Sequence, residues 1–246
     1  INALLDGLQA DSPVRQVLIG AFWTAVVLGT DPHGCGLAST LRAETHHEGS
    51  PVPRAGRLLE HSGRELAEWL RSPRILEASV GMAAFNALLE VDEAACTEMN
   101  AEDVIVRRGA GRRVAIVAHF PFVERVRQAA EVCWVLELRP RAGDLSAGQA
   151  NEVLLQADVV ALTGTSLLNH TFDDLVALCH PEAFVVLLGA SAPLSPVLFE
   201  HGVDAISGTR VVDVPAVLQA VGQGATFRQI PGKRLLTMMR EPSKNR

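Results

Sequence analysis

A histidine and a glutamate stand where two consecutive strands of the chain are expected to end. His119 follows the apolar run "VAIVA", and Glu137 lies near the end of the next run, "VCWVLEL", eighteen residues later. Imidazole can act as an acid or base, a hydrogen-bond partner or a metal ligand. A carboxylate at a second strand end commonly accepts hydrogen bonds from ribose hydroxyls. Two structural alternatives stay open: backbone groups could satisfy His119, and Arg139 or Arg141 could pair with Glu137.

The turn that carries His119 differs from a nucleotide-binding turn. Glycines let backbone N–H groups approach a pyrophosphate, whereas this turn reads "HFPF" and includes Phe120 and Pro121. Pro121 lacks an N–H group but suits the first position of a helix. We therefore expect no dinucleotide cradle, although a carboxylate or another anion could bind at the electropositive start of that helix.

Two later turns present small polar groups. "LTGTSLLNH" supplies Thr163, Gly164 and Thr165, and its Asn169 is expected either to cap the following helix or to face a ligand. "GASAPLSP" supplies Ser191 in a turn made rigid by two prolines. Because the carboxyl ends of parallel strands meet at one edge of a sheet, we expect these groups to converge with the first two strand ends on one ligand site.

The hydrophobic pattern divides the chain in two and predicts an α/β fold class. Residues 1–99 contain β-branched runs around Gly20 followed by two helical segments, which is an α+β order. Residues 100–246 alternate Val/Ile/Leu-rich runs with helical spans, as expected for a parallel sheet buried on both faces. The predicted architecture is a small N-terminal α+β subdomain and a C-terminal Rossmann-like domain.

Composition restricts the partners and the compartment. The net charge is -6 and tyrosine is absent, so we expect neither a nucleic-acid surface nor a membrane surface. No uninterrupted apolar run of about 18 residues predicts a membrane span. Four widely spaced cysteines favour a reducing cytoplasm over a disulfide framework. We expect a cytoplasmic protein with a small-molecule or metal ligand, and a homodimer is compatible with so apolar a chain.

A second group of metal-ligating residue types, His46, His47 and Glu48, stands in a polar loop. Adjacent loop residues hold a metal only if another ligand is fixed elsewhere, so a solvated loop is the favoured interpretation. The chain contains no HExxH, GxSxG, GxxxxGK[ST] or paired-cysteine motif, and the common zincin, hydrolase and NTPase signatures are therefore absent.

The order of these segments resembles the heavy-metal chelation family. The segments that carry the resemblance are "GLAST", "VGMAAFNALL", "VAIVAHFPF", "ADVVALTGTSLLNHT" and "LLGASAPLSPVLFEHGVDAISGTRVVD". It implies an N-terminal subdomain like that of enolase, a Rossmann-like domain and a site in the cleft between them. The family's patterned positions fall on Gly20, Thr24, Gly36, Ser39, Thr40, Asn86, His119, Phe120, Pro121, Glu137, Pro140, Thr163, Gly164, Thr165, Asn169, Ser191 and Pro193. Ala118 stands where the family usually has glycine, and Ala190 where it usually has proline.

Two classes of function are compatible with these residues. One is a protein that binds a metal ion or a metal complex in the interdomain cleft, with His119 and Glu137 as ligands of a divalent metal. The other is an enzyme that acts on a small anionic or adenosine-containing molecule, with S-adenosylmethionine as a candidate cofactor. His119 would then be the acid or base, and Glu137 would bind hydroxyls. A non-catalytic module whose cleft is only a domain seam is the third possibility.

Overall fold

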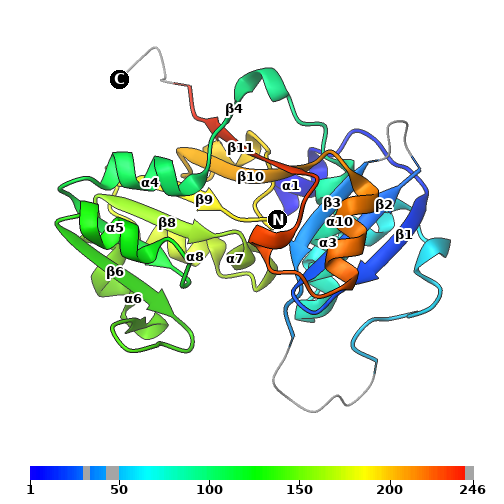
Figure 1. Cartoon of the computed structure of the whole chain (residues 1–246), viewed down its shortest axis with the longest axis horizontal. Helices are drawn as coiled ribbons and strands as arrows, with labels where there is room; N and C mark the ends of the chain where they lie inside the picture. The colour runs from blue at the N-terminus through cyan, green and yellow to red at the C-terminus, as the bar shows by residue number, and fades with distance from the viewer. Residues whose placement is uncertain (30–33, 43–49, 242–246) are drawn as a thin grey trace.

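The computed structural model describes residues 1–29, 34–42 and 50–241, and within these ranges the chain forms two sheets (Figure 1). The smaller sheet is antiparallel and has the order β1-β2-β3. Its strands and flanking helices are α1 (Asn2–Asp6), β1 (Val14–Ile19), β2 (Trp23–Leu28), β3 (Cys35–Ser39), α2 (Gly63–Ala67) and α3 (Ile75–Leu88), with 3-10 turns η1 (Leu58–Glu60) and η2 (Glu68–Arg71).

The helix α3 forms the core of this first unit. Met82, Ala83 and Phe85 have no exposed surface, as expected for a helix that is apolar on almost every side. A Cβ added at Gly36 of β3 would lie 2.1 Å from the carbonyl oxygen of Ala83. The close approach of this strand to the helix therefore requires glycine.

The larger sheet has the order β4-β11-β10-β9-β8-β5-β6-β7 in the described part of the chain. The strands from β10 to β7 are parallel, and β11 and β4 extend the sheet antiparallel. The strands are β4 (Cys96–Glu98), β5 (Arg113–Val117), β6 (Val132–Glu137), β7 (Leu145–Ser146), β8 (Val159–Thr163), β9 (Phe184–Leu188), β10 (Ala205–Val211) and β11 (Lys233–Met239). The helices are α4 (Ala101–Gly109), α5 (Val123–Ala129), α6 (Ala150–Leu154), α7 (Thr165–Leu168), α8 (Phe172–Ala177), α9 (Val197–Glu200) and α10 (Val214–Gly222), with 3-10 turns η3 (Glu93–Ala95), η4 (Ala147–Gln149) and η5 (Phe227–Gln229).

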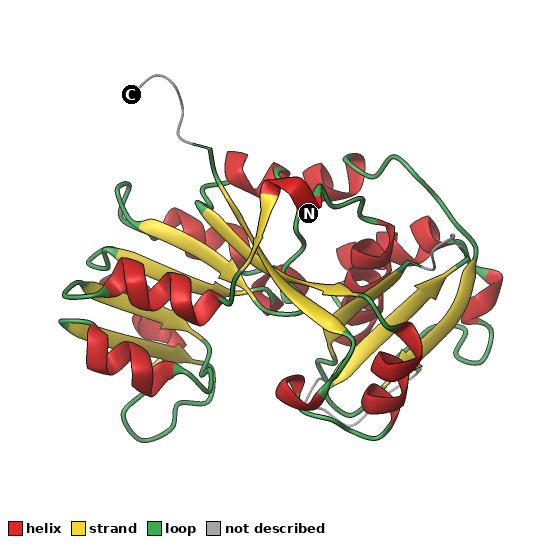
Figure 2. Cartoon of the chain, turned by 45° about the horizontal axis from the view of Figure 1, so that its top comes forward, coloured by secondary structure: helices red, strands yellow, loops and turns green. Residues whose placement is uncertain are grey.

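Helices cover both faces of the parallel strands (Figure 2). Val114 and Ile116 of β5 belong to the buried cluster that includes residues of α4 and α5. Ala115, between them, belongs to the cluster that includes residues of α6 and α8. Successive strand residues point to opposite faces, so β5 has apolar residues at each position from Val114 to Val117. The predicted fold class, a small α+β unit with a Rossmann-like parallel-sheet domain, is confirmed.

The helix α10 connects the two sheets. It follows β10 in sequence but packs against β1 and β2 of the smaller sheet (Figure 1). A Cβ at Gly20 would lie 2.6 Å from the carbonyl oxygen of Val221, and Trp23 Nε1 donates to the carbonyl of Ala225 at 3.1 Å. The C-terminal half therefore supplies part of the cover of the N-terminal sheet.

Two details complete the description of the fold. The helix after the first parallel strand begins at Val123, with Phe122 as its N-cap. The prediction that Pro121 is its first residue was therefore wrong by two positions, because Pro121 lies in the turn before the helix. No helix among the described residues has the length and hydrophobicity needed to cross a bilayer.

Candidate functional site

A cavity of about 540 Å³ lies between the smaller sheet and the carboxyl ends of the parallel strands. We call it the chamber. It is lined by residues of β2 and β3, by the start of α4, by the turns that follow β5, β8 and β9, and by β10 and the segment around η5. Residues of both sheets thus contribute to its wall, and ligand cavities of α/β proteins commonly lie at such strand ends.

The wall of the chamber is rich in aromatic rings. The chain has only eight Phe and three Trp, and five of these eleven rings line the chamber: Phe22, Trp23, Phe120, Phe122 and Phe227. The rings of Phe120 and Phe122 are stacked, with centroids 5.1 Å apart and planes at 9°. Those of Trp23 and Phe227 are 5.2 Å apart and tilted by 48°. Such faces favour a flat, apolar ligand.

The hydroxyls predicted at the third strand end line the chamber. Thr163 Oγ1 and Thr165 Oγ1 are 3.0 Å apart and share a hydrogen bond. Gly164, between them, permits a close approach, because a Cβ there would lie 2.5 Å from the backbone nitrogen of Ala192. The sequence had no signal for one further hydroxyl in the wall, Thr209 Oγ1, which is buried and has no hydrogen-bond partner among the described residues.

Ser191 and Ser39 join the two domains beside the chamber. The backbone N–H of Ser39 donates to Ser191 Oγ at 2.8 Å, and Ser191 is only 1% exposed. Both residues also line the chamber. The hydroxyl of Ser191 therefore has a structural partner, and its role as a ligand contact stays a prediction.

Four polar residues named by the resemblance to the family, Thr24, Thr40, Asn86 and Asn169, make internal contacts and are not among the described residues that line the chamber. Thr24 and Thr40 share a hydrogen bond of 2.9 Å between their hydroxyls. The Asn86 amide donates to the carbonyls of Leu37 and Ala190, which links α3 to both domains. Asn169 Oδ1 accepts from the backbone N–H and the hydroxyl of Thr171 in a local turn.

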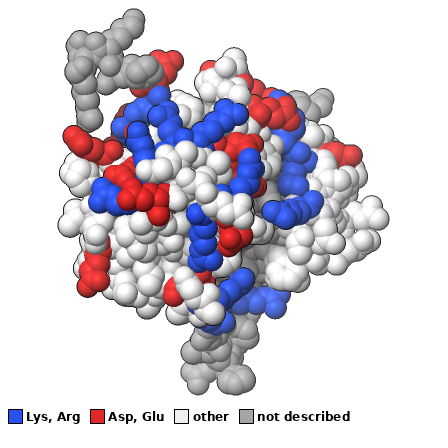
Figure 3. Space-filling model, turned by 60° about the vertical axis from the view of Figure 1, so that its left-hand side comes forward, with Lys and Arg blue, Asp and Glu red and all other residues white. Residues whose placement is uncertain are grey.

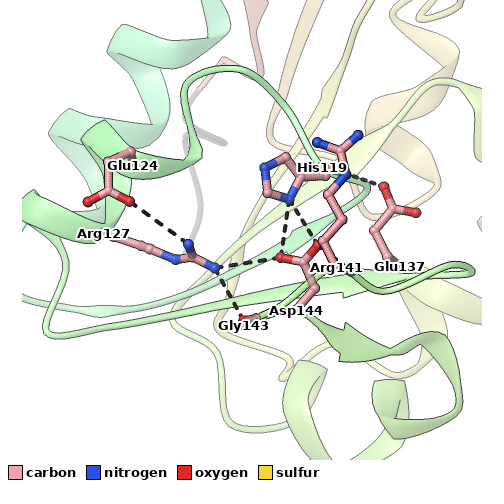
Figure 4. A network of polar contacts seen from close by, with 7 residues as sticks. All are labelled: His119, Glu124, Arg127, Glu137, Arg141, Gly143 and Asp144. Carbon is pink, nitrogen blue, oxygen red and sulfur yellow. Dashed lines mark hydrogen bonds and ion pairs between the residues drawn. The ribbon is translucent and has the colours of Figure 1, made fainter.

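His119 lies on a separate hollow of about 360 Å³, which we call the recess. Its lining residues are His119, Phe120, Pro121, Val123, Glu124, Arg127 and Arg141. Phe120 and Pro121 also line the chamber, so they form the boundary between the two cavities. Glu137 lines neither cavity. Its Oε1 accepts a hydrogen bond of 2.6 Å from the backbone N–H of His119 and thereby orients the turn (Figure 4).

Asp144 holds the imidazole of His119 and is the residue that the sequence interpretation missed. Its Oδ2 lies 2.9 Å from His119 Nδ1, and its side chain is fully buried. Burial acts to raise the pKa of the Asp144 carboxyl. The hydrogen bonds from His119 and from the backbone N–H of Arg141, together with the charges of His119 and Arg127, outweigh burial and lower that pKa. Asp144 is therefore ionised at neutral pH, and His119 Nδ1 carries the shared proton.

Backbone strain accompanies this turn. Ala118, directly before His119, has φ 89°, a region that residues with a Cβ adopt at a cost of order 1–3 kcal/mol. Its N–H donates to the carbonyl of Leu136 at 2.9 Å, which holds it between β5 and β6. Strain of this kind commonly occurs at functional sites, and a glycine would relieve it.

The residues present do not fit a metal ion held by protein side chains alone. Among the described residues, the lining of the chamber includes no His or Cys, and its one carboxylate, that of Glu102, has Oε1 2.9 Å from Arg125 Nη1. No group of three His, Cys, Asp or Glu with metal-ligating geometry occurs within residues 1–29, 34–42 and 50–241. The His46–His47–Glu48 loop lies outside the described residues. His119 and Glu137 thus lack a third protein ligand in the described part of the chain.

Two solved structures resemble this chain over nearly its full length. A solved structure from Desulfitobacterium hafniense, a protein of unknown function from the DUF364 family, is 26% identical, with a TM-score of 0.82 over 97% of this chain and 96% of that one. A DUF364 structure from Pyrococcus horikoshii, 19% identical with a TM-score of 0.82 over 97% of each chain, shares the fold. An uncharacterized protein of Methanocaldococcus jannaschii is 27% identical over 151 residues, which span 58% of each chain.

Two family models, both described as "Putative heavy-metal chelation", match residues 1–89 and 100–240. Residues 90–99, between the two matches, include β4 of the larger sheet. The chain belongs to this heavy-metal chelation family.

Proposed function

We propose that the chamber binds a small aromatic organic molecule, and that a heavy metal enters it as a complex with such a molecule. The observation that carries this proposal is the chemistry of the wall: the described residues that line it include five aromatic rings and several hydroxyls but no histidine or cysteine. A metal ion requires a first shell of several donor atoms. In this chamber those donors would come mainly from the organic ligand.

The dimensions of the chamber support an organic ligand. Cavities of roughly 300–1,000 Å³ enclose molecules of drug size, and the chamber has about 540 Å³. Aromatic faces would contribute apolar contact, while the hydroxyls of Thr163, Thr165 and Thr209 would orient the polar end of the ligand. The buried Thr209 hydroxyl, without a described protein partner, would gain a hydrogen bond from such a ligand.

S-adenosylmethionine receives no comparable support. That hypothesis places the ribose hydroxyls on Glu137, whose carboxylate accepts from the backbone of His119 and lines neither cavity. An acid or base role for His119 is favoured by its contact with Asp144. His119 would act in the recess, on a group of the ligand that extends past Phe120.

Fluorescence titration tests the proposal, because Trp23 lines the chamber. The probes are iron(III) alone, catechol (a single-ring aromatic chelator) and the iron(III)–catechol complex. We expect the complex and catechol to quench the fluorescence saturably and iron(III) alone to have no specific effect. Stoichiometric binding of iron(III) alone, with neither organic probe bound, would contradict the proposal.

A matched pair of variants locates the binding. Phe22 lines the chamber and is 54% exposed, while Leu59 is 57% exposed and does not line the chamber. Phe22→Ala should weaken binding of the complex several-fold because an aromatic contact is lost. Leu59→Ala should leave it unchanged.

A further inference from the structure

We infer that the recess is a binding site for the carboxylate or phosphate group of a small molecule, in which Arg141 binds the anion and the doubly protonated imidazole of His119, oriented by Asp144, donates a hydrogen bond to it. This site goes beyond the proposed function and does not rest on it. The recess and the chamber share only Phe120 and Pro121 among their lining residues, so each can be tested in variants that leave the other intact.

Arg141 supplies the cation. Its side chain is exposed, and no carboxylate or carbonyl among the described residues bonds its guanidinium. Figure 4 shows this guanidinium alongside the imidazole of His119. The backbone N–H of Arg141 donates to Asp144 Oδ2 at 3.2 Å, which fixes the position from which the Arg141 side chain extends. A guanidinium matches the geometry of a carboxylate or phosphate with two parallel hydrogen bonds.

The acidic groups near the recess already have partners. The fully buried Asp144 side chain bonds His119 and lies 3.6 Å from Arg127 Nη2. Glu137 accepts from the backbone of His119. Glu124 is 72% exposed and lies 3.9 Å from Arg127 Nη1. On the face that Figure 3 shows, basic and acidic side chains are interspersed, so anion affinity would come from local geometry and not from one large basic surface.

His119 presents one ring nitrogen to the recess. Nδ1 is held by Asp144 at 2.9 Å, and Nε2 has no hydrogen-bond partner in the described ranges. The ring is 22% exposed at the recess. A carboxylate that fixes one nitrogen of an imidazole sets the orientation of the other. Asp144 is therefore a positioning residue. In the imidazole protonated on both nitrogens, Nδ1–H donates to Asp144 and Nε2–H is the group that donates to the anion.

Calorimetric titration of the full chain tests the site. The probes are inorganic phosphate and succinate, at an ionic strength held constant with sodium chloride. Arg141→Gln should weaken binding at least tenfold, because charge-assisted hydrogen bonds are lost. The control is Arg107→Gln, which removes the same charge from an exposed position of α4 outside the recess and should change affinity less than twofold. Binding of one probe alone would identify the anion as phosphate or carboxylate.

The role of Asp144 has its own measurement. Nitrogen chemical shifts of the imidazole should place the proton of neutral His119 on Nδ1 in the wild type. In Asp144→Asn they should show a mixture of the Nδ1 and Nε2 tautomers. The same variant should bind the anion several-fold more weakly. The inference is overturned if the wild type shows no saturation with either probe up to roughly 50 mM, or if Arg141→Gln binds as the wild type does. An unchanged proton position in Asp144→Asn would overturn the role of Asp144.

Discussion

The chamber and the recess lie on either side of Phe120 and Pro121, yet different side chains build them. The chamber has aromatic rings, hydroxyls and closely packed glycines, whereas the recess has an imidazole, two guanidiniums and carboxylates. The first suits the body of an organic molecule, and the second suits an anionic group. The family name suggests metal binding. Neither cavity, however, has a complete set of metal ligands among the described residues.

A substitution at Gly164, in the wall of the chamber, should change the free energy of unfolding more than the other substitutions below. Gly164→Ala should lower the free energy of unfolding by about 3 kcal/mol, because the new Cβ would lie 2.5 Å from the backbone nitrogen of Ala192. Gly148→Ala is the control, since the nearest atom to its Cβ would be 3.7 Å away. Urea denaturation should show a change of at most about 0.5 kcal/mol for that control. Equal losses in both variants would mean that the wall is not tightly packed at Gly164.

The next effect concerns the contact between the domains beside the chamber. Ser191→Ala should lower the free energy of unfolding by about 2 kcal/mol, because it leaves the backbone N–H of Ser39 without its acceptor. Chemical denaturation measures this loss. A loss below about 0.5 kcal/mol would indicate that water replaces the Ser191 hydroxyl.

The carboxyl group of Asp144, beside the recess, should make the free energy of unfolding depend on pH. Asp144→Asn should destabilise the protein by about 1.5 kcal/mol at neutral pH, because a charge-assisted hydrogen bond is replaced. The pKa of Asp144 lies below its ordinary value of 3.8 in the folded state, so its ionised form stabilises the fold above the unfolded pKa. This stabilisation is lost as pH falls through the lower folded pKa.

Unfolding curves of the wild type and of Asp144→Asn should therefore still differ in stability from neutral pH down to about pH 5. The two should converge only in more acidic solution, below 3.8. A difference that disappears at a higher pH would contradict the assignment of the low pKa to Asp144.

The smallest predicted change in the free energy of unfolding is an increase. Ala118→Gly should stabilise the protein by about 1 kcal/mol, because glycine adopts φ 89° without strain. The control is Ala130→Gly, where φ is -79° and glycine only adds freedom to the unfolded chain. Thermal unfolding should show a higher Tm for the first variant and a lower Tm for the second. Two lowered values would show that the turn at Ala118 is unstrained.

Much of the chamber could be predicted from the sequence, because it follows from strand periodicity. Apolar runs such as Val114–Val117 identify buried parallel strands, and their carboxyl ends must meet at one edge. Thr163, Gly164, Thr165 and Ser191 therefore lie in one wall, as expected. Trp23 and Phe227 could not be placed this way, because α10 and η5 pack back on the smaller sheet through contacts distant in sequence.

The recess was less predictable because a loop builds it. His119 was expected to share a site with the threonines, but the bulk of Phe120 and Pro121 separates it from them. Glu137 was considered as a partner for ribose, a metal or an arginine, whereas it accepts from the backbone of His119. Asp144 lies after Gly143, whose φ is 88°, and the path of such a turn has no periodic signal in the sequence.

The proposed function requires that an organic ligand holds the metal that binds in the chamber. Anomalous diffraction at the iron edge, from crystals of the full chain grown with the iron(III)–catechol complex, tests this requirement. We predict one iron peak inside the chamber, near Phe120 and Trp23, with the oxygen atoms of catechol as its ligands. An iron peak within about 2.2 Å of His119 Nε2 or of a Glu137 oxygen would contradict the claim.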